Sequence, residues 1–305
     1  MQTDQFRVTF ETEMRHWWFV ARREILRALL AEVVPPSAEA VLVDVGCATG
    51  GNLALLSKDY TCVGIELSPD ALALAQSRPC GARFICGAAP DDLGEWARRA
   101  RLFLVADVLE HVEDDAGLLR GLVECALPGA YLLLTVPADP SQWGLHDVSH
   151  GHRRRYDRAA LEALWQGLPV EPLLVSYYNA RLYPLVKCAR WWNRLRGRSY
   201  GEAGTDLKIP PAPVNRLLRR VLRGELRVLR DVLHGRRRQG YARGVSLIAL
   251  LRKAPSAPDP AVRRAGSCVP VASPGEPEKA LPVLGAPVRL DAGPGSPASP
   301  PPVIV

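Results

Sequence analysis

The sequence predicts an α/β fold in which a doubly wound sheet of seven strands carries helices on both faces. Short apolar segments alternate with amphipathic segments between residues 41 and 136, at the spacing of strand–helix–strand units. A glycine-rich turn at 46–51 follows the first apolar segment and opens into a helical pattern. Two further strands are expected at 170–178 and 243–252, and a helical insertion is expected between them.

The other elements are assigned in order along the chain. Residues 13–34 have apolar residues at helical spacing and end at Pro35-Pro36, which predicts one helix. Strands are expected at 41–45, 61–67, 82–86, 101–106 and 131–136, and helices at 52–58, 70–77, 91–100 and 113–127. Ser68 is the expected N-cap of the helix at 70–77, with Pro69 at its first position.

Charge and proline content divide the chain unevenly. Residues 1–180 hold 16 basic and 24 acidic side chains, whereas residues 181–253 hold 19 basic and only 4 acidic ones. Residues 254–305 contain 13 of the 27 prolines and no periodic apolar pattern, which is typical of disorder. The predicted parts are an N-terminal helix or lid at 1–36, a core at 37–178, a basic helical insertion at 179–240, a last core strand at 241–253 and a disordered tail at 254–305.

Several classes of protein are disfavoured by the composition. No run of about 18 apolar residues is present, so no membrane-spanning helix is expected. The polar segment Met1–Phe10 lacks the pattern of a secretory signal. The seven cysteines are an odd number without CxxC spacing, so we expect no disulfide framework, no zinc or other metal site, and a reducing cytoplasm as the compartment.

The glycine-rich turn indicates a ligand site. Gly46 and Gly50 allow the backbone to approach a ligand closely, and Glu66, at the end of the second strand, can accept hydrogen bonds from a ribose diol. Dinucleotide-binding folds share these features, and a tight turn without a ligand is the alternative. Asp44 would repel a diphosphate but attract a ligand that carries an amino group and a sulfonium. This favours S-adenosylmethionine over NAD or FAD.

The motif D-V-G-C-A-T-G at 44–50, together with G-I-E-L-S, resembles the class I S-adenosylmethionine-dependent methyltransferases. The run D-V-L-E-H-V at 107–112 and the Pro128-Gly129 turn are similar to those of quinone-biosynthesis O-methyltransferases, and the resemblance covers roughly 10–253. It implies a Rossmann-like sheet and S-adenosyl-L-methionine as cofactor. The cofactor residues it implies are Asp44, Gly46, Cys47, Ala48, Gly50, Glu66, Leu67, Asp107 and Val108. Ala48 replaces the more usual glycine, and Cys86–Ala89 lacks the acidic residue that often faces adenine, for which Asp91 or Asp92 is the candidate substitute.

A narrower resemblance rests on H-W-W-F at 16–19 with Arg22-Arg23, on His146-Asp147 with G-H-R-R-R-Y at 151–156, and on the set Asn215, Glu225 and G-V-S at 244–246. These residues are similar to a bacterial group of methyltransferases often found with glycan or lipid-linked-glycan genes. The acceptor it implies is a glycan or lipid-linked saccharide. A small-molecule hydroxyl, quinone-like or of a secondary metabolite, is the alternative, and a non-catalytic S-adenosylmethionine-binding protein is the alternative of another class. A nucleic-acid methyltransferase is disfavoured, because the Asn/Asp-Pro-Pro-aromatic motif is absent from the sequence.

Histidines gather after the fifth predicted strand. An oxygen nucleophile has to lose its proton, and histidine is the usual base near neutral pH. The candidate catalytic residues are His152 or His146 as base, with Asp147 as orienting carboxylate; the candidate acceptor contacts are Trp17, Arg155 and Tyr156. The alternative is that His152, Arg155 and Tyr156 only lock the loop after the fifth strand onto the next helix. His111 is expected to be structural or to face the cofactor.

The basic segment 181–240 contains an amphipathic pattern. Residues 214–233 place eight apolar residues, Leu217 among them, on one stripe and arginines on the rest, and Trp191 and Trp192 lie upstream. This pattern suits an anionic membrane surface or an acidic substrate such as a pyrophosphate-linked lipid. We therefore expect a cytoplasmic protein that associates with the inner membrane face. A helical cap on the sheet with a solvated arginine face is the alternative, and nucleic acid is disfavoured as a partner.

Overall fold

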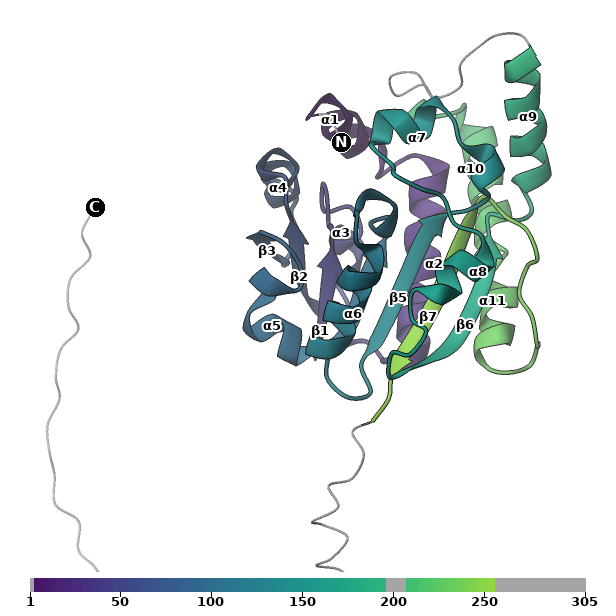
Figure 1. The fold of residues 1–305 in the computed structure, drawn as a ribbon. Coiled ribbons are helices and arrows are strands. Elements are labelled where there is room, and N and C mark those ends of the chain that lie inside the picture. The colour runs from purple at the N-terminus through teal and green to yellow at the C-terminus, as the bar shows by residue number, and fades with distance from the viewer. Residues whose placement is uncertain (1–2, 196–206, 256–305) are drawn as a thin grey trace, which may run out of the picture. The chain divides into compact units, whose positions relative to one another are not determined.

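A seven-stranded sheet forms the centre of the computed structural model, which describes residues 3–195 and 207–255 (Figure 1). The strands are β1 Ser37–Val45, β2 Tyr60–Glu66, β3 Arg83–Cys86, β4 Ala100–Ala106, β5 Tyr131–Pro137, β6 Val170–Tyr178 and β7 Ser246–Lys253. Their order in the sheet is β3-β2-β1-β4-β5-β7-β6. Strands β1 to β5 pair in parallel, and β7 runs antiparallel to both β5 and β6. The predicted Rossmann-like, doubly wound sheet of seven strands is confirmed.

Helices connect and cover the strands. They are α1 Thr3–Thr12, α2 Trp17–Val33, α3 Leu53–Leu56, α4 Pro69–Gln76, α5 Glu95–Arg99, α6 Asp115–Cys125, α7 Leu145–His150, α8 Arg158–Ala163, α9 Tyr183–Leu195, α10 Ala212–Arg223 and α11 Leu226–Leu233, with 3-10 turns η1 Asp91–Leu93, η2 Leu109–His111 and η3 Pro140–Gln142. The cap on α4 is as predicted, since the Ser68 side chain accepts a hydrogen bond from the Ala71 amide. The two six-residue helices α7 and α8 are too short for a periodic pattern and were not predicted.

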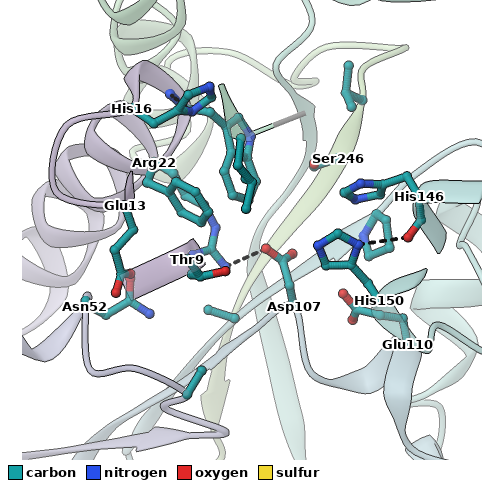
Figure 2. Close-up of a pocket in the computed structure, with 18 of the residues that line it drawn as sticks. Thr9, Glu13, His16, Arg22, Asn52, Asp107, Glu110, His146, His150 and Ser246 are labelled. Carbon is teal, nitrogen blue, oxygen red and sulfur yellow. Dashed lines mark hydrogen bonds and ion pairs between the residues drawn. The ribbon is translucent and has the colours of Figure 1, made fainter. Parts of the chain in front are cut away.

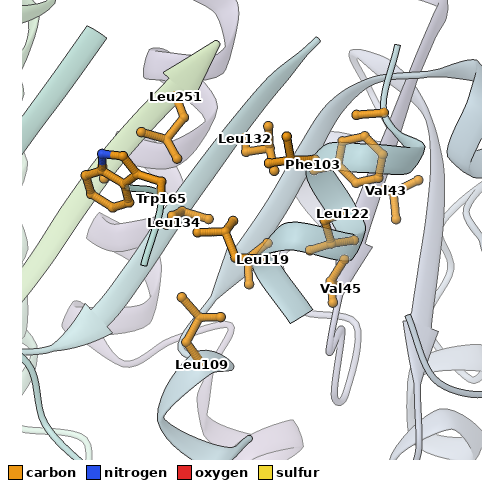
Figure 3. Packing of buried hydrophobic residues seen from close by; sticks show 14 of the residues in the cluster. Val43, Val45, Phe103, Leu109, Leu119, Leu122, Leu132, Leu134, Trp165 and Leu251 are labelled. Carbon is orange, nitrogen blue, oxygen red and sulfur yellow. The ribbon is translucent and has the colours of Figure 1, made fainter. Parts of the chain in front are cut away.

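Two apolar clusters hold the helices against the sheet. Because side chains alternate along a strand, Val43 and Val45 of β1 point to one face and Leu42 points to the other. Helices α5, α6 and α8 cover the first face, where Leu119 and Leu122 pack against the sheet (Figure 3). Helices α2, α3, α4, α10 and α11 contribute to the second cluster. Each fully buried leucine contributes about 1.5–3 kcal/mol, so both faces stabilise the fold.

The N-terminal part differs from the single helix predicted at 13–34. The structure contains α1 and α2, which are separated by a turn at 13–16. The start of α2 is held by Asn215, whose Oδ1 accepts from the Trp17 amide at 2.9 Å and whose Nδ2 donates to the Arg15 carbonyl at 2.9 Å. Asn215 therefore fixes the start of α2 across 198 residues of sequence, together with the local N-cap His16, whose side chain accepts from the Trp18 amide at 3.4 Å.

The insertion between β6 and β7 contains the expected helices. The stripe at 214–233 is divided between α10 and α11, because the chain turns at Gly224 and Glu225. Leu222 and Leu229 are fully buried in the second cluster, but Leu217 of the same stripe is 59% exposed. The buried carboxylate of Glu225 accepts a hydrogen bond from the Arg181 amide at 2.8 Å and so fixes the beginning of the insertion.

The arginines of the insertion are partly neutralised by α2. Arg219 and Arg223 both pair with Glu24, and Arg230 pairs with Glu32 at 2.7 Å. These contacts agree with the helical-cap alternative for α10 and α11. Contact with an anionic membrane stays a prediction. No helix within the described ranges is long and apolar enough to cross a membrane.

The described residues belong to one compact unit, Met1–Ser256. The five domain boundaries stay predictions within it. The predicted disordered tail lies outside the described residues, except for residues 254 and 255.

Candidate active site

A cavity of about 310 Å³ lies at the carboxyl ends of the parallel strands, where ligands bind in doubly wound sheets. Its walls come from the glycine turn after β1, the loops after β4 and β5, the α1–α2 turn and the loop around α7. Figure 2 shows Asp107 between two sides of this cavity, with Glu13 and Asn52 on one side and Glu110, His146 and His150 on the other. We call these the glycine-turn side and the histidine side.

The glycine turn is built around a close backbone approach. Gly46 has a φ of +65°, and a Cβ atom at this position would lie 2.7 Å from Cγ2 of Val108. Only glycine satisfies both conditions without strain. The Glu66 carboxylate holds the turn from the end of β2, since it accepts from the Ala48 amide at 3.0 Å and from the Ser68 amide at 2.9 Å. A carboxylate has about four acceptor sites, so Glu66 retains capacity for a ribose hydroxyl.

Asp44 lies directly beneath this turn and is 1% exposed. Its Oδ2 accepts from Nδ2 of Asn52 at 3.4 Å, and its Oδ1 has no hydrogen-bond partner in the described structure. Burial raises the pKa of Asp44 to about 7. An unpartnered buried carboxylate is stabilised by a nearby positive charge. The site therefore fits a cationic ligand better than a diphosphate.

An ion pair between a buried arginine and a partly buried aspartate crosses the floor of the cavity. Arg22 of α2 lies 2.6 Å from Oδ2 of Asp107 (Figure 2). Thr135 donates to Oδ1 of Asp107 at 3.0 Å. Arg22 also donates to the Thr135 hydroxyl at 3.2 Å. Asp107 was predicted as a cofactor residue, whereas Arg22 was noted only as part of the narrower resemblance. The ion pair between Arg22 and Asp107 anchors α2 to the loop after β4.

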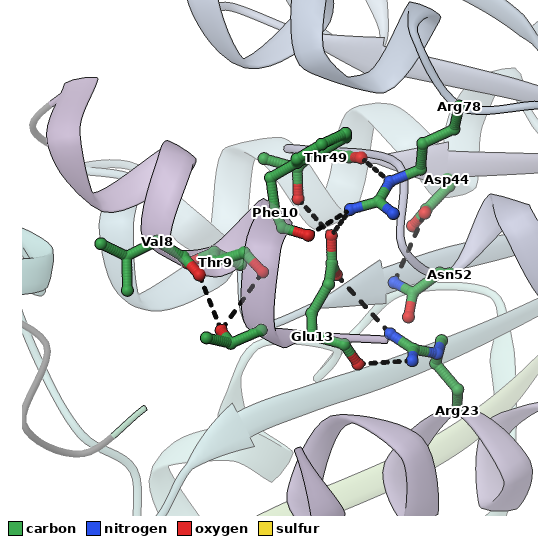
Figure 4. Close-up of polar contacts among 10 residues, drawn as sticks. Val8, Thr9, Phe10, Glu13, Arg23, Asp44, Thr49, Asn52 and Arg78 are labelled. Carbon is green, nitrogen blue, oxygen red and sulfur yellow. Dashed lines mark hydrogen bonds and ion pairs between the residues drawn. The ribbon is translucent and has the colours of Figure 1, made fainter. Parts of the chain in front are cut away.

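Glu13 makes a second anchor on the glycine-turn side (Figure 4). Its buried carboxylate forms ion pairs with Arg23 and Arg78 and accepts a hydrogen bond from the Thr49 hydroxyl. A Cβ atom on Gly51 would overlap this carboxylate, so the turn and Glu13 fit against each other closely. No sequence signal indicated Glu13, because its partners are 10 to 65 residues away.

On the histidine side, Asp147 organises the loop around α7. The Asp147 carboxylate is fully buried and lies 2.8 Å from Nδ1 of His152, and it accepts from Nε of Arg155 at 2.7 Å and from the Gly144 amide at 2.9 Å. Although burial acts to raise it, the hydrogen bonds from His152 and Arg155 hold the pKa of Asp147 well below its usual value. Asp147 is therefore an anion that fixes the orientation of His152.

Four histidine rings gather beside this carboxylate. The ring centroids of His111 and His152 are 4.8 Å apart, and those of His146 and His150 are 4.0 Å apart. All four residues line the cavity. Burial lowers the pKa of His111 to about 4, so this ring is neutral at physiological pH. The histidine side is thus rich in imidazole nitrogens.

The structure brings together only part of the predicted site. The predicted residues that line the cavity are Trp17, Gly46, Cys47, Ala48, Asp107, His146, His152 and Arg155. The predicted residues that do not line it are Asp44, Gly50, Glu66, Leu67, Val108, Asp147 and Tyr156. Asp44, Glu66, Val108 and Asp147 support lining residues, as described above. Leu67 is 70% exposed, and the buried Tyr156 hydroxyl donates to Asp115 at 2.6 Å, so Tyr156 does not reach the cavity.

The fold and the cavity beside the glycine turn define a Rossmann-like domain with a cleft at its strand ends. A family model described as "Methyltransferase domain" matches residues 14–168. The chain belongs to this methyltransferase family. The narrower bacterial groups that the sequence resembles stay predictions.

Curated relatives and a solved structure are consistent with this assignment. The trans-aconitate 2-methyltransferases of Acidovorax sp. (strain JS42) and Acidovorax ebreus (strain TPSY) are each 30% identical over 119 residues, which is 37% of this chain. The match spans 44% of their length, less than half of these relatives. The plantazolicin methyltransferase BpumL in complex with SAH aligns with a TM-score of 0.51 at 15% identity, over 82% of this chain and 89% of BpumL. This likeness shows the fold.

Proposed function

We propose that this chain is an S-adenosylmethionine-dependent methyltransferase that methylates a hydroxyl oxygen of a glycan or lipid-linked saccharide. Membership of the methyltransferase family supports the reaction class. The observation that carries the cofactor assignment is Asp44, a buried carboxylate with an unused oxygen beneath a glycine turn. BpumL, which shares the fold, was solved with SAH.

S-adenosyl-L-methionine is the cofactor, and it supplies a methyl group already activated by a sulfonium. Gly46 and Ala48 would hold its methionine half by close backbone approach, and Glu66 would accept from its ribose. Asp44 supplies a negative charge that favours the cationic cofactor over the neutral thioether product. The protein then has mainly to align the acceptor atom with the methyl group.

We infer that the acceptor binds on the histidine side. Arg22 and Arg155 are the arginines that line the cavity, and both are paired with aspartates. The described walls of the cavity therefore offer no uncommitted arginine or lysine to a carboxylate acceptor, which favours a neutral hydroxyl. Val186 and Leu207 of the insertion also line the cavity, so the insertion contributes to acceptor selection. A small-molecule hydroxyl is the second candidate for the acceptor.

The proposal is tested with isotopically labelled S-adenosylmethionine and an extract of cells that express the chain. Transfer of one labelled methyl group to a saccharide-containing species, identified by mass spectrometry, would support it. Cofactor binding without any transfer would favour the non-catalytic alternative. Transfer to a small molecule would keep the reaction class and replace the acceptor.

Replacing His152 with alanine should lower turnover by about 100-fold while cofactor affinity is retained, because a positioned imidazole contributes about this factor to proton removal. Asp147 fixes this ring, which lines the cavity on the histidine side. Steady-state methyl transfer and calorimetric cofactor binding give the two quantities. His234→Ala, at a surface ion pair with Glu32, is the matched control. An unchanged turnover in His152→Ala would remove this histidine from the reaction.

Cofactor affinity should depend on pH through Asp44. Its pKa is raised to about 7 by burial, so the carboxylate is protonated below and ionised above this value. Since the ionised form attracts the sulfonium, affinity is lost as the pH falls through 7, by about tenfold between about pH 8 and about pH 6. Calorimetric titration should show this slope for S-adenosylmethionine and a shallower one for the uncharged sulfur of S-adenosylhomocysteine. Asp44→Asn should bind weakly at both pH values; an equally steep slope in this variant would contradict the assignment.

A further inference from the structure

Glu110 is a buried carboxylate that the proposed reaction does not use. It lies in η2, it is fully buried, and neither of its oxygens has a hydrogen-bond partner in the described structure. It nevertheless lines the cavity on the histidine side (Figure 2). An unpaired carboxylate at such a depth costs several kcal/mol unless a cation or a proton compensates it. The Glu110 side chain therefore needs either a bound proton or a positively charged partner in the cavity.

The imidazoles of His111 and His152 lie close to the Glu110 carboxylate. One potential ligand atom from each of Glu110, His111 and His152 lies within 4.8 Å of the others. Nδ1 of His152 is engaged by Asp147 at 2.8 Å, and Nδ1 of His111 lies 3.4 Å from the Gly151 carbonyl. The Nε2 atom of each ring is consequently the one available to a ligand. A carboxylate or carbonyl behind the coordinating ring is the usual support of a metal-binding histidine.

We propose that Glu110, His111 and His152 bind a divalent transition-metal ion on the histidine side of the cavity. One carboxylate and two imidazoles are a donor set that suits Zn²⁺, Fe²⁺, Mn²⁺ and Co²⁺ and leaves coordination positions open for an acceptor oxygen. Asp147 and the Gly151 carbonyl orient the two histidines. The inference departs from the expectation of no metal, which rested on cysteine spacing; ligands from η2 and the loop after α7 lie too far apart in sequence to form a recognisable motif.

The metal ion would also have a role in the proposed methyl transfer. This catalytic role rests on the proposed function, whereas metal binding itself does not. An acceptor hydroxyl bound to the ion has a lowered pKa, so it gives its proton to solvent more readily. The oxygen lone pair then forms the new C–O bond, and the electrons of the broken C–S bond return to sulfur. In this arrangement His152 is a metal ligand instead of the base, solvent takes the proton, and the loss of turnover in His152→Ala follows from the loss of the ion.

The direct test measures metal binding by the full chain without cofactor or acceptor. The untagged protein is stripped with a chelator and titrated with Zn²⁺ by calorimetry and with Co²⁺ by visible absorption. We expect one ion per chain and an affinity about 100-fold lower in Glu110→Gln, with a loss of 10–100-fold in Asp147→Asn through the supporting contact. His234→Ala keeps the wild-type affinity, because this histidine lies on the surface with Glu32.

Thermal unfolding shows whether Glu110→Gln is folded. It also distinguishes a Glu110 carboxylate that binds metal from one that only stabilises the fold. Metal-free Glu110→Gln should melt at a higher temperature than metal-free wild type, since it no longer buries an unpartnered carboxylate. Added Zn²⁺ should raise the melting temperature of wild type and leave that of Glu110→Gln unchanged. Absence of stoichiometric binding by wild type, or equal affinity in Glu110→Gln, would overturn the inference. Failure of the proposed function would instead appear as absent methyl transfer by the metal-loaded chain, so the two failures are distinguishable.

Discussion

Gly46→Val is expected to lower the free energy of unfolding by about 4 kcal/mol and to abolish measurable cofactor binding. Gly46 has a φ of +65°, which costs a β-branched residue about 1–3 kcal/mol. Its new side chain would also meet Val108 at 2.7 Å, and overpacking of this kind costs about 1–3 kcal/mol. Urea unfolding and calorimetric titration with S-adenosylmethionine measure the two losses.

Variants at two other glycines distinguish backbone strain from overpacking as causes of this loss of stability. A Cβ atom on Gly129, where φ is +77°, meets nothing within 4 Å, so Gly129→Val reports backbone strain alone. Gly81 has neither a positive φ nor a neighbour within 4 Å, and Gly81→Val should change stability by less than about 0.5 kcal/mol. Adding Val108→Ala to Gly46→Val should recover the overpacking part only. Equal stability losses in Gly46→Val and Gly129→Val would show that the contact with Val108 is unimportant.

Asp107→Asn should lower the free energy of unfolding by about 3 kcal/mol, because it leaves the buried guanidinium of Arg22 without a counter-charge. Asparagine keeps the shape of the side chain and tolerates the φ of +58° at this position, so the lost charge is the main change. Denaturant unfolding at neutral pH measures the effect. Cofactor binding should also weaken, since the loop after β4 loses its anchor to α2.

The double variant Arg22→Met/Asp107→Asn should recover at least half of the lost stability, since no unpaired charge then remains buried. Asp231→Asn is the matched control, because Asp231 pairs with Arg236 at 3.0 Å on the surface. Its effect should stay below about 1 kcal/mol. A double variant that is less stable than Asp107→Asn alone would mean that Arg22 stabilises the fold by other contacts.

Patterns within a few residues were sufficient to predict the sheet. The apolar runs correspond to β1–β7 within a few residues. For the parallel strands β1–β5 the reason is that buried parallel strands need continuous apolar segments. The Ser68 cap and the glycine turn are likewise local features with local signals. The fold class therefore follows from the sequence to a large extent.

The contacts that complete the site were not predictable in this way. Asn215 caps α2 across 198 residues, and Glu13 meets Arg78 across 65. Glu110 belongs to the motif D-V-L-E-H-V at 107–112. Its burial and its proximity to His152, however, depend on how the loop after β4 and the loop around α7 fold together. Such long-range pairs leave no periodic trace in the sequence, since each partner alone has an ordinary local environment.

The double hydrogen bond from Asn215 also bears on how this domain can be re-engineered. The insertion supplies the residue that starts α2, and α2 supplies Arg22 to the cavity floor. Exchanging the insertion for that of another family member, in order to transplant acceptor preference, would therefore disturb the cofactor half of the cleft as well. The exchangeable part of this domain is the insertion together with the first 33 residues, both grafted at the same time.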